Sequence, residues 1–142
     1  MELLTYSTIE VGAIKAMKIM VLDDNPEILL MVTAMLHSAY GSDNCMIISG
    51  RNGTEGLTLL LEGDETPDII LTNLRMPHMD GMTFVAEVRH NNAWDKIRVV
   101  MMSAVTSSEI MSQAITSGAE AYLRKPFTYR DLTTMINDML AN

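Results

Sequence analysis

The chain has 142 residues, of which 48% are hydrophobic and 20% are charged, and this fits one compact domain with a sizeable core. Its 10 Lys and Arg residues against 18 Asp and Glu residues give a formal net charge of -8. This balance argues against sequence-independent binding of the domain to nucleic-acid phosphates, so we expect a protein partner and no direct nucleic-acid contact.

The start of the chain carries no long apolar block, so it indicates neither a signal peptide nor a membrane span. We treat residues 1–17 as an N-terminal extension of unknown role and 18–142 as the domain. The single cysteine, Cys45, cannot form an internal disulfide and lies in an apolar run. We therefore expect a buried thiol and a cytoplasmic protein.

Apolar runs of strand length alternate along the domain with segments of helical period. This alternation predicts a parallel sheet with helices on both faces. Five strands are expected, at residues 18–22, 45–49, 69–72, 98–102 and 121–123.

Short polar side chains mark the helix starts, because they accept hydrogen bonds from amides that lack intrahelical partners. Asn25 before Pro26 predicts the first helix, and Asp80 predicts the third. Pairs of cap-like residues three positions apart predict the others, namely Asn52 with Glu55, Thr106 with Glu109, and Thr128 with Asp131.

Two of these helices carry an apolar stripe at helical spacing, which predicts packing on the sheet. The stripes are Ile28, Val32, Met35 and Leu36 in the first helix, and Leu132, Met135, Ile136, Met139 and Leu140 in the last. Most of the 14 methionines are expected to fill gaps in the core; a Met-rich groove for a partner is the alternative.

Polar residues follow four of the expected strands. In open parallel sheets, functional groups gather beyond the carboxyl ends of the strands, where the loops converge. The candidates at that edge are Asp23 and Asp24 after the first strand, Asn73 after the third, Ser103 after the fourth and Lys125 after the fifth.

Residues 67–81, PDIILTNLRMPHMDG, resemble the active-site strand and loop of bacterial response-regulator receiver domains, with Asn73 at the position of the phosphorylated aspartate. Five separated elements over residues 18–140 agree with this family, and the residue type fails only at Asn73. The resemblance implies an α/β, flavodoxin-like fold with a five-stranded parallel sheet in the order 2-1-3-4-5 and five flanking helices.

The resemblance also implies a metal site. Asp23 and Asp24 match the acidic pair that binds Mg2+, and Arg75 lies where the family supplies a ligand through its backbone carbonyl. Carboxylate and carbonyl oxygens are the ligands that this hard dication prefers. Taken alone, Asp23 and Asp24 would be read as an exposed acidic turn.

Further family positions complete a phosphoryl pocket. Lys125 matches the lysine that pairs with the acceptor aspartate and its phosphate, in a Lys125-Pro126-Phe127 motif whose first peptide bond is usually cis. Ser103 matches the hydroxyl residue that contacts a phosphoryl oxygen, and Tyr122 matches the aromatic switch residue. Taken singly, Ser103 and Tyr122 would be an ordinary strand-end hydroxyl and a half-buried aromatic.

Asn73 changes what this pocket can do. Phosphoryl transfer needs an anionic oxygen, and an amide oxygen is neutral and weakly nucleophilic, so no acyl phosphate is expected at Asn73. The lost charge should weaken Mg2+ binding without necessarily abolishing it. We expect Lys125 to turn toward Asp23 or Asp24, and Arg75 either to pair with Asp24 or to be exposed.

The leading hypothesis is a single-domain, non-enzymatic receiver in phosphorelay signal transduction that is not phosphorylated at Asn73. It would bind signalling proteins, such as a histidine kinase or a downstream effector, through the fourth helix, fifth strand and fifth helix, as a monomer or weak homodimer. The alternative is an Asp-to-Asn trapped form of an Mg2+-dependent phospho-receiver, and whether Asn73 is the natural residue stays open. A third hypothesis is an enzyme or small-ligand protein using Asp23, Asp24 and Lys125.

The remaining residues of chemical interest have plainer expectations. His37, His78 and His90 lack metal-ligand spacing, and we expect them to be solvated or to cap helices. Trp94 lies in a polar connection and is expected to pack over a helix end, with a contact surface as the alternative.

Overall fold

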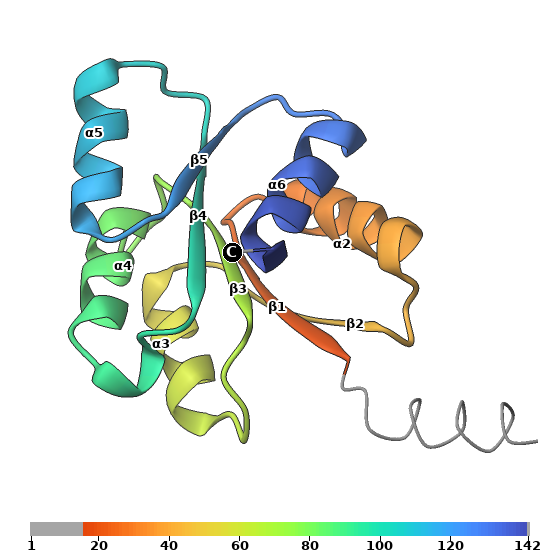
Figure 1. The fold of residues 1–142 in the computed structure, drawn as a ribbon. Coiled ribbons are helices and arrows are strands. Elements are labelled where there is room, and N and C mark those ends of the chain that lie inside the picture. The colour runs from red at the N-terminus through yellow and green to blue at the C-terminus, as the bar shows by residue number, and fades with distance from the viewer. Residues whose placement is uncertain (1–15, 142) are drawn as a thin grey trace, which may run out of the picture.

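Strands and helices alternate along the chain in the computed structural model, which describes residues 16–141 (Figure 1). Residues 1–15 of the expected extension lie outside this range. The elements are β1 Met17–Leu22, α2 Pro26–Tyr40, β2 Cys45–Gly50, α3 Gly53–Glu62, β3 Ile69–Asn73, α4 Gly81–Arg89, η1 Asn92–Trp94, β4 Arg98–Ser103, α5 Ser108–Ser117, β5 Ala121–Arg124 and α6 Tyr129–Ala141.

All neighbouring strands in the sheet run parallel, in the order β2-β1-β3-β4-β5, which confirms the expected topology. Because the strands are parallel, all of their carboxyl ends meet at one edge of the sheet. The expected strands stopped one residue early at Asn73 and Ser103, which still pair with Met102 and Arg124. Because these last residues are polar, the apolar run in the sequence ends before the backbone pairing does.

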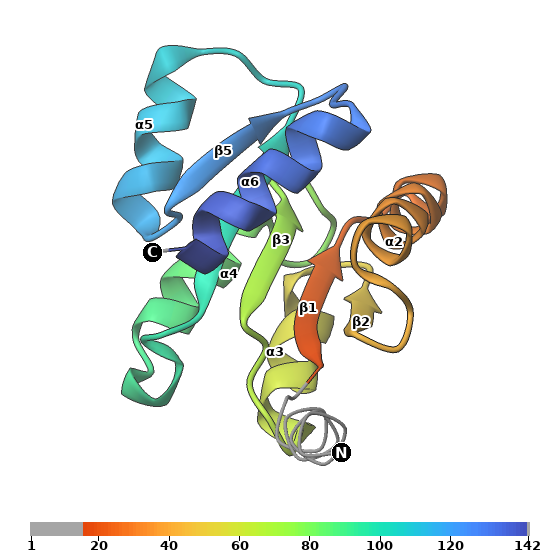
Figure 2. The same ribbon diagram turned by 45° about the vertical axis from the view of Figure 1, so that its right-hand side comes forward.

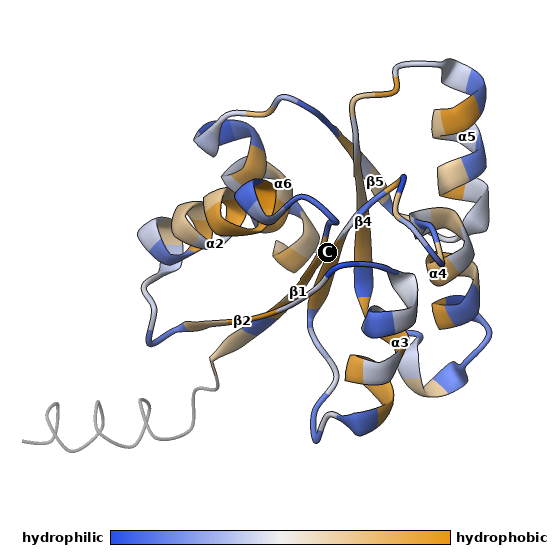
Figure 3. Cartoon of the chain, turned by 180° about the vertical axis from the view of Figure 1, so that it is seen from behind, coloured by the Kyte–Doolittle hydropathy of each residue, from blue (hydrophilic) through white to orange (hydrophobic). Residues whose placement is uncertain are grey.

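Successive strand residues point to opposite faces of the sheet, and this alternation divides the core in two. In β1, Ile19 and Val21 face one cluster, whereas Met20 and Leu22 face the other. Figure 2 shows α2 and α6 together on one face of the sheet and α3, α4 and α5 on the other. The strands are hydrophobic along most of their length, as expected for a sheet covered on both sides (Figure 3).

The helix starts agree with the expected caps except in α5. Asn25, Asn52 and Asp80 each accept a hydrogen bond from a first-turn amide through their side chain. Thr128 and Asp131 cap α6 reciprocally, since the side chain of each residue accepts a hydrogen bond from the backbone amide of the other. The cap expected at Thr106 is wrong by one residue: the Ser107 hydroxyl accepts from Ile110 N at 3.4 Å.

The apolar stripes pack on the sheet with one exception. Val32, Leu36, Leu132 and Ile136 are fully buried, and the methionines and Ile28 of the stripes pack partly buried beside them. Leu140 was expected on the stripe but is 48% exposed, in the last turn of α6. Cys45 and most methionines were expected to lie in the core. Cys45, Met20, Met101 and Met102 are buried.

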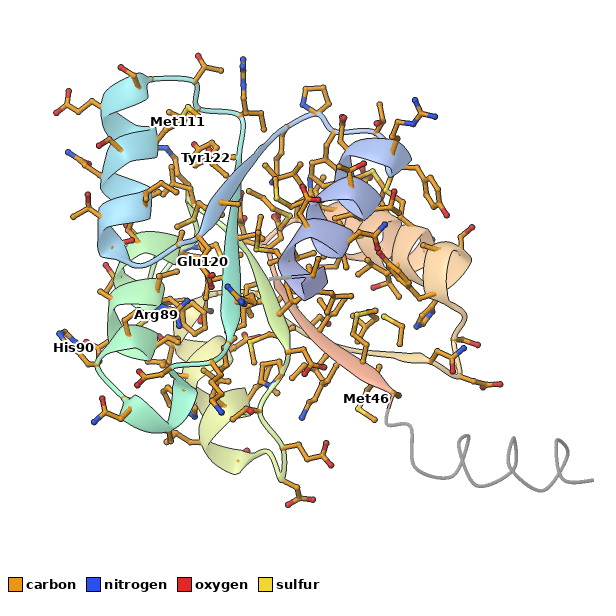
Figure 4. All side chains as sticks on the ribbon, viewed as in Figure 1. Met46, Arg89, His90, Met111, Glu120 and Tyr122 are labelled. Carbon is orange, nitrogen blue, oxygen red and sulfur yellow. The ribbon has the colours of Figure 1, made fainter. Side chains whose placement is uncertain are left out.

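Arg89 of α4 contacts residues next to the amino edge of the sheet. Its guanidinium donates to the carbonyl of Gly118 at 3.1 Å and pairs with Glu120 at 3.3 Å, and Figure 4 shows these two side chains directed toward one another. Trp94 is 7% exposed and packs in the core beside Val88, so the packing expectation for it is confirmed. This end of the molecule lies away from the candidate site.

The three histidines take different places. His90 is the C-cap residue of α4, and His78 is exposed with a positive φ of 69°. His37 is half-buried, and its Nε2 is 3.1 Å from the carbonyl of Cys45, so it is neither solvated nor a cap as expected. Between residues 16 and 141, none of the helices has the length and apolar character required to cross a bilayer.

Candidate functional site

Four strand ends bring the candidate residues to the carboxyl edge of the sheet. Asp23 directly follows β1, Asn73 and Ser103 are the last residues of β3 and β4, and Lys125 directly follows β5. The backbone holds them in place, since Asp23 N donates to the Gly50 carbonyl at 3.1 Å and Lys125 N donates to the Ser103 carbonyl at 2.9 Å. The Lys125-Pro126 peptide bond is cis, as the motif implied.

Lys125 connects Asp23 with Asn73. Its Nζ donates to Asp23 Oδ2 at 2.7 Å and to Asn73 Oδ1 at 2.9 Å. The side chain of Asp23 is 1% exposed and that of Lys125 is 19% exposed. A buried carboxylate needs a counter-charge, so this ion pair satisfies both groups. The expected turn of Lys125 toward the acidic pair is confirmed for Asp23.

Both the oxygen and the nitrogen of the Asn73 carboxamide form hydrogen bonds. Its Oδ1 accepts from Lys125, and its Nδ2 donates to the backbone carbonyl of Arg75 at 2.7 Å. The neighbouring backbone is equally constrained, because a Cβ added at Gly81 would lie 2.2 Å from the Asn73 carbonyl oxygen. Glycine at the start of α4 therefore allows the end of β3 to approach this closely.

Asp24 and Arg75 do not meet. Both side chains are exposed, and no ion pair joins them in the part of the chain that the structure describes. Of the two alternatives left open for Arg75, the exposed one therefore holds. Asp24 is instead contacted at its backbone carbonyl, to which the Arg51 guanidinium donates at 3.4 Å.

Ser103 and Tyr122 converge on one residue that the sequence did not indicate. Ser103 Oγ accepts from the backbone amide of Val105 at 3.0 Å, and the Tyr122 hydroxyl donates to the backbone carbonyl of Val105, also at 3.0 Å. Ser103 is 4% exposed and Tyr122 is half-buried between β5 and α5 (Figure 4). Val105 acts through its backbone, so its side chain carries no signal of this role.

Two of the oxygen donors expected to hold a divalent cation form hydrogen bonds within the protein. Within residues 16–141 no group of three or more His, Cys, Asp or Glu side chains could hold a metal ion. Asp23 accepts from Asn25 N at 3.0 Å in addition to Lys125. The Arg75 carbonyl, expected as a ligand, accepts from Asn73 instead. The site therefore resembles a closed hydrogen-bonded cluster more than an open cation cage.

Comparison with solved structures shows what the fold is similar to. The chemotaxis response regulator CheY4 of Vibrio cholerae is 26% identical with a TM-score of 0.79, covering 88% of this chain and 99% of that one. The receiver domain of the sensor histidine kinase PA1611 from Pseudomonas aeruginosa PAO1 is 20% identical with a TM-score of 0.79, covering 89% and 99%. That structure has a magnesium ion coordinated in its active site cleft.

Curated relatives are much longer proteins. The sensor histidine kinase CheAY of Helicobacter pylori is 34% identical over 90 residues, which is 63% of this chain and 11% of that protein. The hybrid signal transduction histidine kinase D of Dictyostelium discoideum is 25% identical over 122 residues, 86% of this chain and 7% of that protein. The chain therefore spans only a small part of the length of these relatives.

Residues 19–137 match the sequence model of the response regulator receiver domain. The match covers most of the chain and agrees with the fold and with the strand order. This chain belongs to the response regulator receiver domain family, whose members are the receiver modules of two-component phosphorelay signalling.

Proposed function

We propose that this receiver is not phosphorylated at Asn73 and acts by binding other proteins. The observation that carries the proposal is the contact of Asn73 Oδ1 with Lys125, in the pocket where family members hold the acceptor aspartate. The amide oxygen is neutral, and the ammonium group of Lys125 draws further electron density from it. Neither condition suits attack on a phosphorus atom.

Lys125 also has a counter-charge in the pocket without a phosphoryl group. Asp23 supplies the counter-charge for Lys125, and none of the buried side-chain polar atoms in residues 16–141 lacks a hydrogen-bond partner. We infer that the pocket keeps this arrangement when no phosphoryl group is present.

The proposed docking face is formed by α5, β5 and α6, the fourth helix, fifth strand and fifth helix of the sequence expectation. Ile115 of α5 is 47% exposed, and Met111 on the same side of the helix is partly exposed. Tyr122 connects this face to Ser103 through Val105. Proposed partners are a histidine kinase or a downstream effector protein, with the chain itself non-enzymatic, cytoplasmic and monomeric or weakly dimeric.

Binding measurements on immobilised protein test this proposal. Histidine kinases and effector proteins from the same source would be titrated with and without acetyl phosphate and Mg2+, using Asn73→Asp as the matched variant. We expect saturable binding that the phosphodonor leaves unchanged for the wild type and alters for Asn73→Asp. Wild-type binding that responds to the phosphodonor, or no saturable partner at all, would contradict the proposal.

A second candidate is a trapped form of an ordinary phospho-receiver. It is favoured by the presence of Asp23, Asp24, Ser103 and Lys125 at one edge, which is the full set of family positions apart from the acceptor. In that case the parent protein would accept phosphate from a histidine kinase with Mg2+ bound. Sequencing the native gene separates the two, because an aspartate codon at position 73 would establish the trapped form.

A further inference from the structure

We propose that Lys125 is the resident cation of this pocket and that Asn73, by its orientation, keeps divalent metal ions out. The inference concerns the metal alone. A bound metal would not make a carboxamide nucleophilic, so this inference and the proposed absence of phosphorylation can fail separately.

The number of acceptor oxygens at position 73 decides how many cations the side chain can serve. A carboxylate has two oxygens and can face a lysine with one and a metal ion with the other. A carboxamide has one oxygen, and in this structure Asn73 Oδ1 lies 2.9 Å from Lys125 Nζ. Asn73 therefore has no second side-chain oxygen for a metal ion, and its one oxygen already faces the ammonium charge of Lys125.

The other end of the same amide is a donor directed at the expected metal ligand. Asn73 Nδ2 donates to the Arg75 carbonyl at 2.7 Å. An amide hydrogen carries partial positive charge, and here it occupies the lone-pair region of the oxygen that a metal would need. A divalent ion at this place would meet an N–H group where a carboxylate oxygen would otherwise lie.

Rotation of the amide does not release the site. Exchanging the oxygen and nitrogen of Asn73 would place its NH2 group against the ammonium of Lys125 and its oxygen against the Arg75 carbonyl. Two hydrogen bonds would become a donor-donor and an acceptor-acceptor contact. Lys125 and Arg75 together therefore fix the orientation in which Asn73 faces a metal with donors.

The remaining oxygens make a weak donor set. Asp23 is 1% exposed, and its two oxygens accept from Asn25 N and from Lys125 Nζ at 3.0 and 2.7 Å. Asp24 is exposed, and its carboxylate has no hydrogen bond or ion pair with another described residue. A single free carboxylate is a poor site for Mg2+, which gives up its water shell reluctantly.

Three variants distinguish the effect of donor orientation on metal binding from the effect of net charge. Each of them lowers the net charge by one. Asn73→Asp adds the missing acceptor oxygen, and Lys125→Met frees the oxygens of Asn73 and Asp23. Arg124→Gln is the matched control, because this arginine directly precedes Lys125 and its exposed side chain is not part of the site. Paramagnetic broadening of amide NMR signals by Mn2+, supported by calorimetric Mg2+ titration, measures binding at the pocket.

We expect Asn73→Asp and Lys125→Met to bind Mn2+ about tenfold or more tighter than the wild type, as one gained charge-assisted contact would produce. Arg124→Gln should stay within about twofold of the wild type, because an exposed charge is screened. An amide spectrum recorded first checks that each variant is folded, and if Lys125→Met is not, the other two variants decide.

Two results would overturn the inference. One is saturable Mn2+ binding by the wild type at the pocket with the affinity of Asn73→Asp. The other is an equal gain in Arg124→Gln and Asn73→Asp, which would assign the weak binding to charge alone. Mass spectrometry of the same samples after phosphodonor treatment reports separately on phosphorylation, so either result leaves the proposed function standing if the wild-type mass is unchanged.

Discussion

The hydroxyl of Tyr122 donates a hydrogen bond to the backbone carbonyl of Val105, 3.0 Å away, and the amide of that same Val105 donates to Ser103 Oγ. A residue in the pocket and a residue on the proposed docking face thus hold one loop residue from two sides. The loop between β4 and α5 is the physical connection between the site and the surface of α5, β5 and α6.

Removing either hydroxyl should loosen this loop. Tyr122→Phe and Ser103→Ala each delete one hydrogen bond to Val105, so each should lower the free energy of unfolding by about 1 kcal/mol. Because both bonds hold one residue, the two losses should be non-additive in the double variant. Denaturant unfolding and hydrogen exchange at residues 104–107 measure these effects.

Tyr40→Phe provides the control for the loop experiment. It removes a tyrosine hydroxyl that donates to Asn137 Oδ1 at 2.8 Å on the other side of the molecule. Hydrogen exchange at 104–107 should not change in this variant. Equal acceleration of exchange in Tyr40→Phe and Tyr122→Phe would show that the loop responds to global stability and not to the Val105 contacts.

Lys125→Met should destabilise the fold. The substitution leaves the buried Asp23 carboxylate without its cation and removes the donor to Asn73 Oδ1. We expect the free energy of unfolding to fall by about 2–4 kcal/mol, with the partial exposure of Lys125 favouring the lower end. Urea denaturation measures it beside Lys96→Met, which removes an exposed ammonium and should change stability by less than about 0.5 kcal/mol. Similar losses in both variants would argue against the ion pair.

His78→Gly tests the backbone of the loop after β3. His78 has a φ of 69°, and Met79 N donates across it to the Pro77 carbonyl at 2.7 Å. A side chain with Cβ is strained by about 1–2 kcal/mol in this left-handed region, whereas glycine is not. After the entropic cost of glycine in the unfolded chain, we expect stability to rise by up to about 1 kcal/mol.

His90→Gly is the paired measurement for His78. His90 has a right-handed backbone with a φ of -78°, so glycine relieves no strain there. This variant should lose about 0.5–1 kcal/mol in the same urea titration. Equal losses at both positions would contradict the strain assigned to His78.

Stability should fall at alkaline pH because of Cys45 and Tyr40. Burial raises the pKa of the Cys45 thiol, and burial followed by repulsion from Cys45 and Tyr129 raises the pKa of Tyr40. The unfolded chain therefore releases these protons at lower pH than the folded chain, so stability is lost as pH rises above about 8.5, the ordinary thiol value. Urea titrations at pH 7 and in steps above pH 8.5 measure the slope, and Cys45→Ala should flatten its first part. An unchanged slope in Cys45→Ala would contradict this assignment.

The order of elements was predictable because strand-length apolar runs and cap residues are local signals. Asn25 and Asp80 appear in the sequence as caps and act as caps. Thr106 and Ser107 are adjacent residues with the same capping chemistry, so only the path of the loop decides that Ser107 caps α5. Leu140 fits the helical stripe by period, and the period alone does not show that its side chain is half exposed in the last turn of α6.

The site was predictable to the level of which residues gather, but not how they bond. Parallel strands bring Asp23, Asn73 and Lys125 to one edge by topology alone. Whether Arg75 pairs with Asp24 depends on side-chain direction in a long loop, and the sequence left both outcomes open. The left-handed backbone at His78 had only the weak signal that histidine tolerates this region better than most residues.

The central claim is that the carboxamide at position 73 cannot receive a phosphoryl group. The most direct measurement is intact-protein and peptide mass spectrometry after incubation with acetyl phosphate and Mg2+, comparing the wild type with Asn73→Asp. We predict no added phosphoryl mass on the wild type, and a hydroxylamine-sensitive phosphoryl group at position 73 of the variant. A phosphoryl group on the wild-type side chain at position 73, found without prior deamidation, would contradict the account.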